Sequence, residues 1–221
     1  MHIPDGLMWP PLLAIGWIVA IAIIAIAVRR TSGKIHVERI PTMAVLASGI
    51  FVAQMLNFPI IGGTTGHLIG ATIATCMVGP WAAVIVMSVV IVMQGLMFGD
   101  GGILAMGLNL TNMAIIGVGI SWLVISMMKG LRSGIAVPVA AWTAVMIAAL
   151  FCAIELSVSN LAAPGTYGIT WSICLPSMLG LHALIGIGEA AITSAVVTYF
   201  ALVAPEILHH SAKKGREVTA E

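Results

Sequence analysis

Apolar stretches about as long as a membrane is thick follow one another along most of the chain. A hydrocarbon core of about 30 Å takes roughly 20 apolar residues in helical form. From this pattern we predict seven transmembrane helices, at residues 10–28, 41–56, 67–78, 81–98, 104–128, 135–158 and 174–203. The third is short for a full span, so we expect it to tilt or to re-enter the membrane in part.

Turn-forming residues mark the connections between these helices. The segment NFPIIGGTTG at residues 57–66 predicts a Gly/Pro loop, and Gly79-Pro80 separates the third helix from the fourth. The whole chain, residues 1–221, is then a single all-α transmembrane domain. Within it we expect an N-terminal loop at 1–9, a helical bundle at 10–204 and a polar tail at 205–221.

Composition supports a protein embedded in a lipid bilayer. Of the 221 residues, 60% are hydrophobic and 8% are charged, whereas soluble domains carry about 25% charged residues. The formal net charge is +1, and no basic stripe with interleaved aromatic residues is present. We therefore expect no nucleic-acid partner.

The distribution of positive charge predicts the orientation. All nine Lys and Arg residues lie after the first predicted helix, after the fifth, or in the tail. They are Arg29, Arg30, Lys34, Arg39, Lys129, Arg132, Lys213, Lys214 and Arg216. With seven spans these places share one side of the membrane, and the positive-inside rule makes that side cytoplasmic. The N-terminus is then extracytoplasmic and the C-terminus cytoplasmic.

Enzyme motifs are absent from the sequence. There is no H-E-x-x-H, no G-x-S-x-G and no Walker A motif. We therefore expect no enzyme activity, and no ATP hydrolysis at a Walker site. The chain also lacks the internal repeats of many secondary transporters, so we expect it to bind a substrate and to need partners to move it.

The N-terminus, MHIPDGLMWPP, carries the most specific chemistry. No Lys or Arg precedes Arg29, which excludes a normal secretory signal. The bulky His2 should disfavour removal of Met1, so we expect a free α-amine on Met1. This amine, the amide nitrogen of His2 and the Nδ1 atom of His2 could close a five-membered and a six-membered chelate ring around one metal ion.

His67 is the candidate fourth ligand, because the predicted topology places it on the same side as the N-terminus. Tetragonal nitrogen ligation is typical of Ni²⁺ or Cu²⁺, and the lack of a thiolate argues against a structural zinc site. Co²⁺ remains a second candidate. The spacing of these residues does not by itself establish a metal site, because a single histidine at a helix end is more often structural.

The segments MHIPDG, GGTTGHLIGA and, at residues 109–117, NLTNMAIIG resemble the NikM/CbiM family over essentially the whole chain. These are the substrate-specific (S) components of energy-coupling-factor (ECF) transporters for nickel and cobalt, in a prokaryotic plasma membrane. The resemblance, closer to NikM, implies Met1, His2 and His67 as ligands of Ni²⁺ or Co²⁺ and Asp5 as a residue that orients the N-terminal loop. The chain ends soon after the last helix, so we expect no fused accessory domain.

The same resemblance implies a transmembrane coupling (T) subunit and two cytoplasmic ATPases as partners. It does not decide whether a small accessory membrane subunit also takes part. Three functions therefore remain: capture of nickel for uptake, capture of cobalt for cobalamin synthesis, and a membrane metal sensor or packing subunit without transport.

Five polar residues outside this set need an explanation. Glu189 and His182 share one face of the last helix, where we expect hydrogen bonds between helices. Glu155 should meet water near a helix end. Asp100 is expected in a turn, with at most a weak attraction for cations. Asn109 either lines the loop over the site or caps a helix, and the sequence does not separate these roles.

Overall fold

The computed structural model describes residues 1–33, 35, 37–61, 64–128 and 133–209. Several positions that carry predictions lie outside these ranges, namely Lys34, Lys129, Arg132, Lys213, Lys214, Arg216 and the tail from residue 210 onward. The predicted Gly/Pro loop is described except for residues 62–63.

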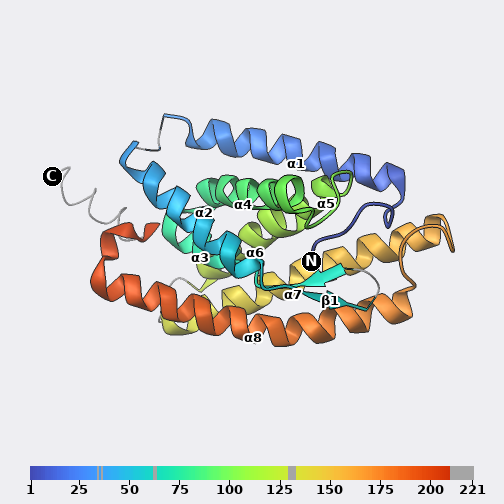
Figure 1. Cartoon of the computed structure of the whole chain (residues 1–221). Helices are drawn as coiled ribbons and strands as arrows, with labels where there is room; N and C mark the ends of the chain where they lie inside the picture. Colours follow the sequence, from blue (N-terminus) through green and yellow to red (C-terminus); the bar gives the residue numbers. More distant parts are fainter. Residues whose placement is uncertain (34, 36, 62–63, 129–132, 210–221) are drawn as a thin grey trace.

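Helices make up nearly all of the described structure (Figure 1). The α-helices are α1 (Pro10–Thr31), α2 (Ile40–Gln54), α3 (Ala71–Val78), α4 (Pro80–Met93), α5 (Met106–Asn109), α6 (Gly117–Met127), α7 (Ser133–Ala162) and α8 (Trp171–Val203). A π-helical segment (Gln94–Phe98) extends α4, and another (Leu110–Ile116) joins α5 to α6. Five of the resulting continuous helices are long and apolar enough to cross a membrane. The prediction of a multi-pass helical membrane protein is therefore confirmed.

The two remaining helices are shorter than a normal span. α2 has 15 residues and α3 has 8. The break between α3 and α4 falls at the predicted place, because Gly79 adopts φ +82° and Pro80 begins the next helix.

The structure adds to one prediction before α3 and corrects another. The predicted Gly/Pro loop contains an antiparallel pair of short strands, β1 (Phe58–Ile60) and β2 (Thr64–Gly66). The third helix begins at Ala71 rather than at His67, because Gly70 adopts a left-handed conformation with φ +79°. His67 therefore lies in a short non-helical connection between β2 and α3, where its orientation depends on tertiary contacts.

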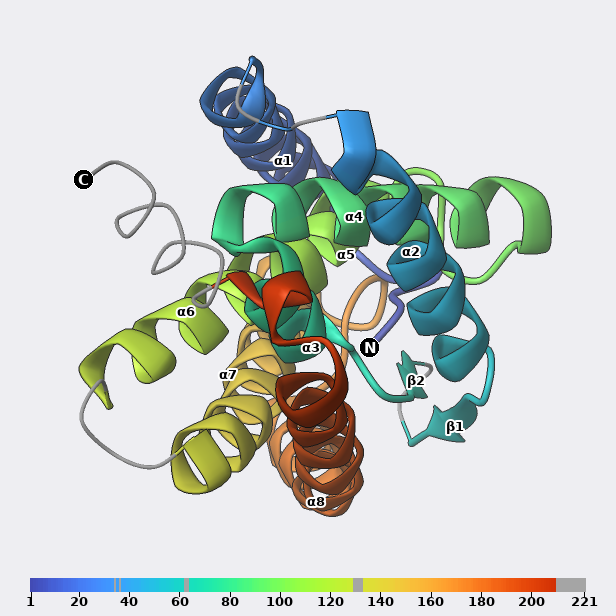
Figure 2. The ribbon, with the colours of Figure 1, turned by 90° about the vertical axis from the view of Figure 1, so that its left-hand side faces the viewer.

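The helices surround the start of the chain (Figures 1 and 2). α7 and α8 form a long antiparallel pair on one side of the molecule, and α1 lies across α4 and α5 on the other. In both views the N-terminus lies between these layers, next to the β-hairpin. The C-terminal ends of α1 and α8 both lie at the opposite end of the bundle from the start of α1, on opposite sides of the molecule. Arg29 and Arg30, in the last turn of α1, mark that end.

Candidate metal site

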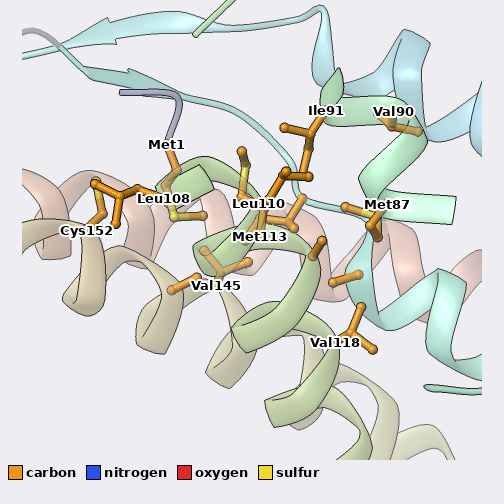
Figure 3. Close-up of a cluster of buried hydrophobic side chains, with 14 of the residues drawn as sticks. Met1, Met87, Val90, Ile91, Leu108, Leu110, Met113, Val118, Val145 and Cys152 are labelled. Atoms are coloured by element: carbon orange, nitrogen blue, oxygen red, sulfur yellow. The ribbon is translucent and has the colours of Figure 1, made fainter. Parts of the chain in front are cut away.

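The first three residues are buried in the protein interior. Met1, His2 and Ile3 have 0%, 1% and 0% of their surface exposed. The side chain of Met1 belongs to the same apolar cluster as Leu108 and Cys152 (Figure 3). Burial of an apolar side chain of this size stabilises by about 1.5–3 kcal/mol, so the chain start is anchored by its own side chains.

Hydrogen bonds from α5 and from the segment before it fix the backbone of this N-terminal loop. The amide of Ile3 donates to Oδ1 of Asn109 (2.8 Å), and the Ile3 carbonyl accepts from Nδ2 of Asn109 (3.1 Å). The Ile3 carbonyl also accepts from the Gly102 amide at 2.8 Å. Of the two roles left open for Asn109, contact with the loop is the one found.

Asp5 holds the outer part of the same loop. Its carboxylate accepts from the backbone amides of Ile103 and Ala105, each at 3.0 Å. Gly102 packs so closely against Asp5 that a Cβ atom there would overlap with it. Asp5 thus bonds to the segment that leads into α5, and two residues separate it from His2 in the chain.

His2 and His67 meet in the interior next to the β-hairpin. Their ring centroids are 4.7 Å apart and the ring planes are inclined by 45°. Thr65, two residues before His67, accepts from both of the first two backbone nitrogens. Its carbonyl accepts from the Met1 amine, and its Oγ1 accepts from the His2 amide at 3.2 Å. The hairpin therefore brings the chain start and His67 to one place.

The imidazole nitrogens include two buried atoms without a partner. Nδ1 of His67 lies 2.7 Å from the Leu68 carbonyl, so it carries the proton and Nε2 presents its lone pair. Among the described residues, Nε2 of His67 and Nε2 of His2 have no hydrogen-bond partner. Buried polar atoms without a partner are rare and need an explanation, and a bound cation is one that suits two neighbouring imidazole rings.

Asp100 lies beside this group of nitrogens. Its Oδ1 is 2.8 Å from Nδ1 of His2, and its Oδ2 accepts from Nδ2 of Asn57 at 2.8 Å. Burial by itself would raise the pKa of Asp100, but the contacts with His2 and Asn57 outweigh burial and lower the pKa. The expected turn residue is thus a neighbour of the candidate site.

Burial keeps these nitrogens neutral. It lowers the pKa of the Met1 amine from 8.0 to about 5. The pKa of His2 is also lowered by burial, although Asp100 opposes this effect. Burial, together with the nearby amine and His2, lowers the pKa of His67 well below its usual value. Because metal ligands must be unprotonated, this environment prepares the nitrogens for a cation.

Side chains alone do not make a metal site here. In the described part of the chain, no group of three or more His, Cys, Asp or Glu side chains is placed to hold a metal ion. A site at this position needs backbone nitrogens, and the Met1 amine and the His2 amide are the two that lie beside Thr65.

The other polar residues differ in part from the expectation. Glu189 bonds from α8 to the backbone amides at the N-terminal end of α3, which agrees with the expected bonding between helices, whereas His182 bonds to the Met178 carbonyl of its own helix. Glu155 is buried and accepts from Asn112 at 2.7 Å, so it does not meet water. Sequence reasoning missed Thr65, because nothing distinguishes it from other polar loop residues.

Comparison with known proteins gives a consistent result. The family model CbiM, described as the cobalt uptake substrate-specific transmembrane region, matches residues 2–207. A putative metal transport protein of Haloquadratum walsbyi is 39% identical over 208 residues, which cover 94% of this chain and 93% of the relative. A putative fused nickel transport protein, NikMN, of Archaeoglobus fulgidus is 35% identical over 216 residues, which cover 98% and 70%. A crystal structure of a truncated transition metal transporter matches with a TM-score of 0.87 and 34% identity, over 91% of this chain and 98% of that one.

Proposed function

Because the chain belongs to the CbiM family, we propose that it captures Ni²⁺ from outside the cell as the S component of an ATP-driven ECF-type uptake transporter. The names of its relatives support a role in nickel or cobalt transport. The observation that carries the proposal is the burial of the chain start, with its amine and both imidazoles, in one place.

Four nitrogens are the proposed ligands: the Met1 amine, the His2 amide, Nδ1 of His2 and Nε2 of His67. The first three belong to consecutive groups of the chain, so they form two fused chelate rings and tend to lie in one plane. Nε2 of His67 is buried, unprotonated and without a hydrogen-bond partner among the described residues, which suits it to the fourth position. Asp5 orients the loop that carries His2.

Binding exchanges protons for the metal. In the described conformation, Thr65 accepts hydrogen bonds from the Met1 amine and the His2 amide, and Asp100 lies against Nδ1 of His2. When the ion binds, the amide releases its proton to solvent, and Nδ1 turns from Asp100 to the metal while the single proton of the neutral imidazole moves to Nε2. Proton release on binding is therefore part of the proposal.

Nickel is preferred because four nitrogens in one plane suit its tetragonal geometry. Cobalt is the second candidate, since the matching family is described by cobalt uptake. Cu²⁺ has the same geometric preference as Ni²⁺, and the names of the relatives favour nickel over it.

Transport requires other subunits. The chain carries no Walker A motif, so ATP hydrolysis belongs to two cytoplasmic ATPases, which act through a T subunit, with a small accessory membrane subunit as a further possible partner. The positively charged ends of the helices face the cytoplasm, and the N-terminus faces outward. The protein then presents its site to the extracytoplasmic side of a prokaryotic plasma membrane.

Metal titration of the purified protein with Met1 at its start tests the proposal. We expect Ni²⁺ to bind more tightly than Co²⁺, with a diamagnetic, square-planar spectrum and release of protons. Addition of one residue before Met1, or acetylation of the amine, should abolish tight binding. The control is the same extension at the C-terminus, which leaves the chain start free.

Each other outcome has a distinct meaning. Tighter binding of Co²⁺ would favour cobalt capture. If neither ion binds, the result would favour the alternative of a packing subunit without transport. If the protein extended at its N-terminus binds Ni²⁺ normally, the amine is not a ligand and the site is wrongly assigned.

A further inference from the structure

Two buried polar side chains hold the connection between His67 and α3. The carboxylate of Glu189 accepts from the Ile69 amide at 2.8 Å through Oε2 and from the Gly70 amide at 2.6 Å through Oε1. On the other side of the same backbone, Nε2 of Gln54 donates to the Ile69 carbonyl at 2.6 Å. Glu189 belongs to α8 and Gln54 to α2, so two helices that lie far apart in the sequence hydrogen-bond to the same segment.

Glu189 is 3% exposed and Gln54 is fully buried. An ionisable group within a membrane span is costly unless its bonding is satisfied. Here the carboxylate meets two consecutive backbone amides at the start of α3, where the partial charge of the helix is positive. These bonds account for both carboxylate oxygens and fix the plane of two peptide groups.

One of those peptide groups also orients His67. The carbonyl of Leu68 and the amide of Ile69 belong to the same peptide bond. Its oxygen lies 2.7 Å from Nδ1 of His67, and its N–H donates to Glu189. The imidazole, the peptide group and the carboxylate therefore form a continuous hydrogen-bonded chain. In such chains, each bond polarises the next.

This chain has a direct consequence for Nε2 of His67. A carbonyl or carboxylate bonded to one imidazole nitrogen sets the tautomer and raises the basicity of the other nitrogen. If the Leu68–Ile69 peptide group turned, Nδ1 would lose its acceptor and Nε2 would lose its fixed direction. The connection is not helical, so no helical hydrogen bonds hold this peptide group in place.

We propose that Glu189, assisted by Gln54, is a positioning residue for metal capture that acts through the Leu68–Ile69 peptide group and His67. The inference rests on the proposed function, because it needs His67 as a ligand. Neither residue touches the ion in this arrangement. Their effect on binding passes entirely through the direction and basicity of one imidazole nitrogen.

The test is Ni²⁺ titration, with visible absorption spectra, of the purified full chain and its Glu189→Gln variant. Glutamine replaces one carboxylate oxygen with an NH2 group, so one of the two backbone amides faces a donor in place of its acceptor. We expect Ni²⁺ affinity to fall by about 10–100-fold, the usual effect of losing an outer partner of a metal-bound histidine. The spectrum of the bound ion should also change. Glu189→Asp, which keeps the carboxylate, should recover part of the affinity.

Gly188→Ala is the matched control, because a Cβ atom at this position of α8 meets no atom within 4 Å. It should bind Ni²⁺ as the unmodified protein does. If Glu189→Gln fails to fold, Gln54→Met replaces it as the test variant. This substitution removes only the donor to the Ile69 carbonyl, and it should also lower the Ni²⁺ affinity.

A double-mutant cycle distinguishes positioning from general destabilisation. If Glu189 acts only through His67, the double variant His67→Ala/Glu189→Gln binds Ni²⁺ no more weakly than His67→Ala alone. Additive losses, or an unchanged affinity and spectrum in Glu189→Gln, would overturn the inference. Failure of the unmodified protein to bind Ni²⁺ or Co²⁺ would instead overturn the proposed function.

Discussion

The ring centroids of His2 and His67 lie 4.7 Å apart, although α1 and α2 separate the two residues in the sequence. The β-hairpin brings the two rings together. Thr65 on β2, two residues before His67, accepts hydrogen bonds from the Met1 amine and the His2 amide. The candidate site is thus a junction between the chain start and one strand of the hairpin.

Removal of either imidazole should abolish tight Ni²⁺ binding. In His67→Ala the fourth nitrogen is lost, and in His2→Gln the Nδ1 atom is lost. Each variant should lose more affinity than the roughly 10–100-fold expected for an outer partner. A calorimetric titration measures this. Glutamine is chosen at position 2 because a small residue there would allow removal of Met1.

The matched control for these variants is His182→Gln. His182 is also buried, with Nδ1 bonded to the Met178 carbonyl and with Nε2 unpaired among the described residues, but it lies on α8 and its ring makes no contact with the rings of His2 or His67. It should keep most of the Ni²⁺ affinity. Equal losses in all three variants would mean that the histidines stabilise the fold and do not bind the ion.

Asp5→Ala should weaken Ni²⁺ binding without altering a ligand. The variant leaves the Ile103 and Ala105 amides without their acceptor, so the loop that carries His2 is held less firmly. Because these bonds are partly exposed to water, we expect roughly a tenfold loss, at the low end for an outer partner. Asp5→Asn keeps one good acceptor and should lie between the two. An affinity equal to that of the unmodified protein would show that Asp5 has no role in binding.

Gly102→Ala should displace the N-terminal loop by steric overlap. A Cβ atom at this position collides with the backbone and carboxylate of Asp5. Overpacking of this kind typically costs about 1–3 kcal/mol, and if this cost falls on the docked loop it corresponds to a loss of Ni²⁺ affinity of about 5- to 150-fold. Gly119→Ala in α6 is the control, because its Cβ meets no atom within 4 Å. If the two variants bind alike, the loop is not held where the structure has it.

Docking of the N-terminal loop in the metal-free protein should weaken as the pH falls from 8 to 5. The buried Met1 amine has its pKa lowered from 8.0 to about 5. Above pH 8 the amine is neutral whether the loop is docked or released. Between pH 8 and 5 only the released amine takes up a proton, which favours release by on the order of 1 kcal/mol per pH unit. Below about pH 5 both states are protonated and this effect ends.

Hydrogen exchange of the Ile3 amide, which is bonded to Asn109, measures this docking. After correction for the intrinsic pH dependence of exchange, its protection should fall over the same pH range. Amides in the middle of α7 serve as the internal control and should keep their protection. A protection of Ile3 that rises as the pH falls would contradict the neutral, buried amine.

The helices could be predicted with good accuracy because their signal is local. An apolar run of sufficient length must become a helix in lipid, since every backbone group needs a hydrogen bond within the segment. The exception was the start of the third helix. Its sequence is apolar from His67 onward, but Gly70 and the bonds from Glu189 keep the connection non-helical as far as Ala71.

The site was predictable only in part. The spacing of donor atoms in Met1 and His2 is a covalent property, so the sequence suggests a chelate by itself. Thr65 was not singled out, Asp100 was expected mainly as a turn residue, and Asn109 was left between two roles, because a threonine, an asparagine or a turn aspartate has many roles in a loop. Their roles follow from which segments pack together.

The sequence by itself determined that this chain lies in a membrane, which segments are helical and which N-terminal atoms have the spacing of a chelate. These depend on apolar length and covalent spacing, and both are read residue by residue. Only the tertiary structure decided that the chain start is buried against the hairpin, that Asp100 lies beside His2, and that Glu189 acts on the backbone next to His67. These contacts join residues far apart in the chain, and their geometry is fixed by the packing of helices that no local pattern specifies.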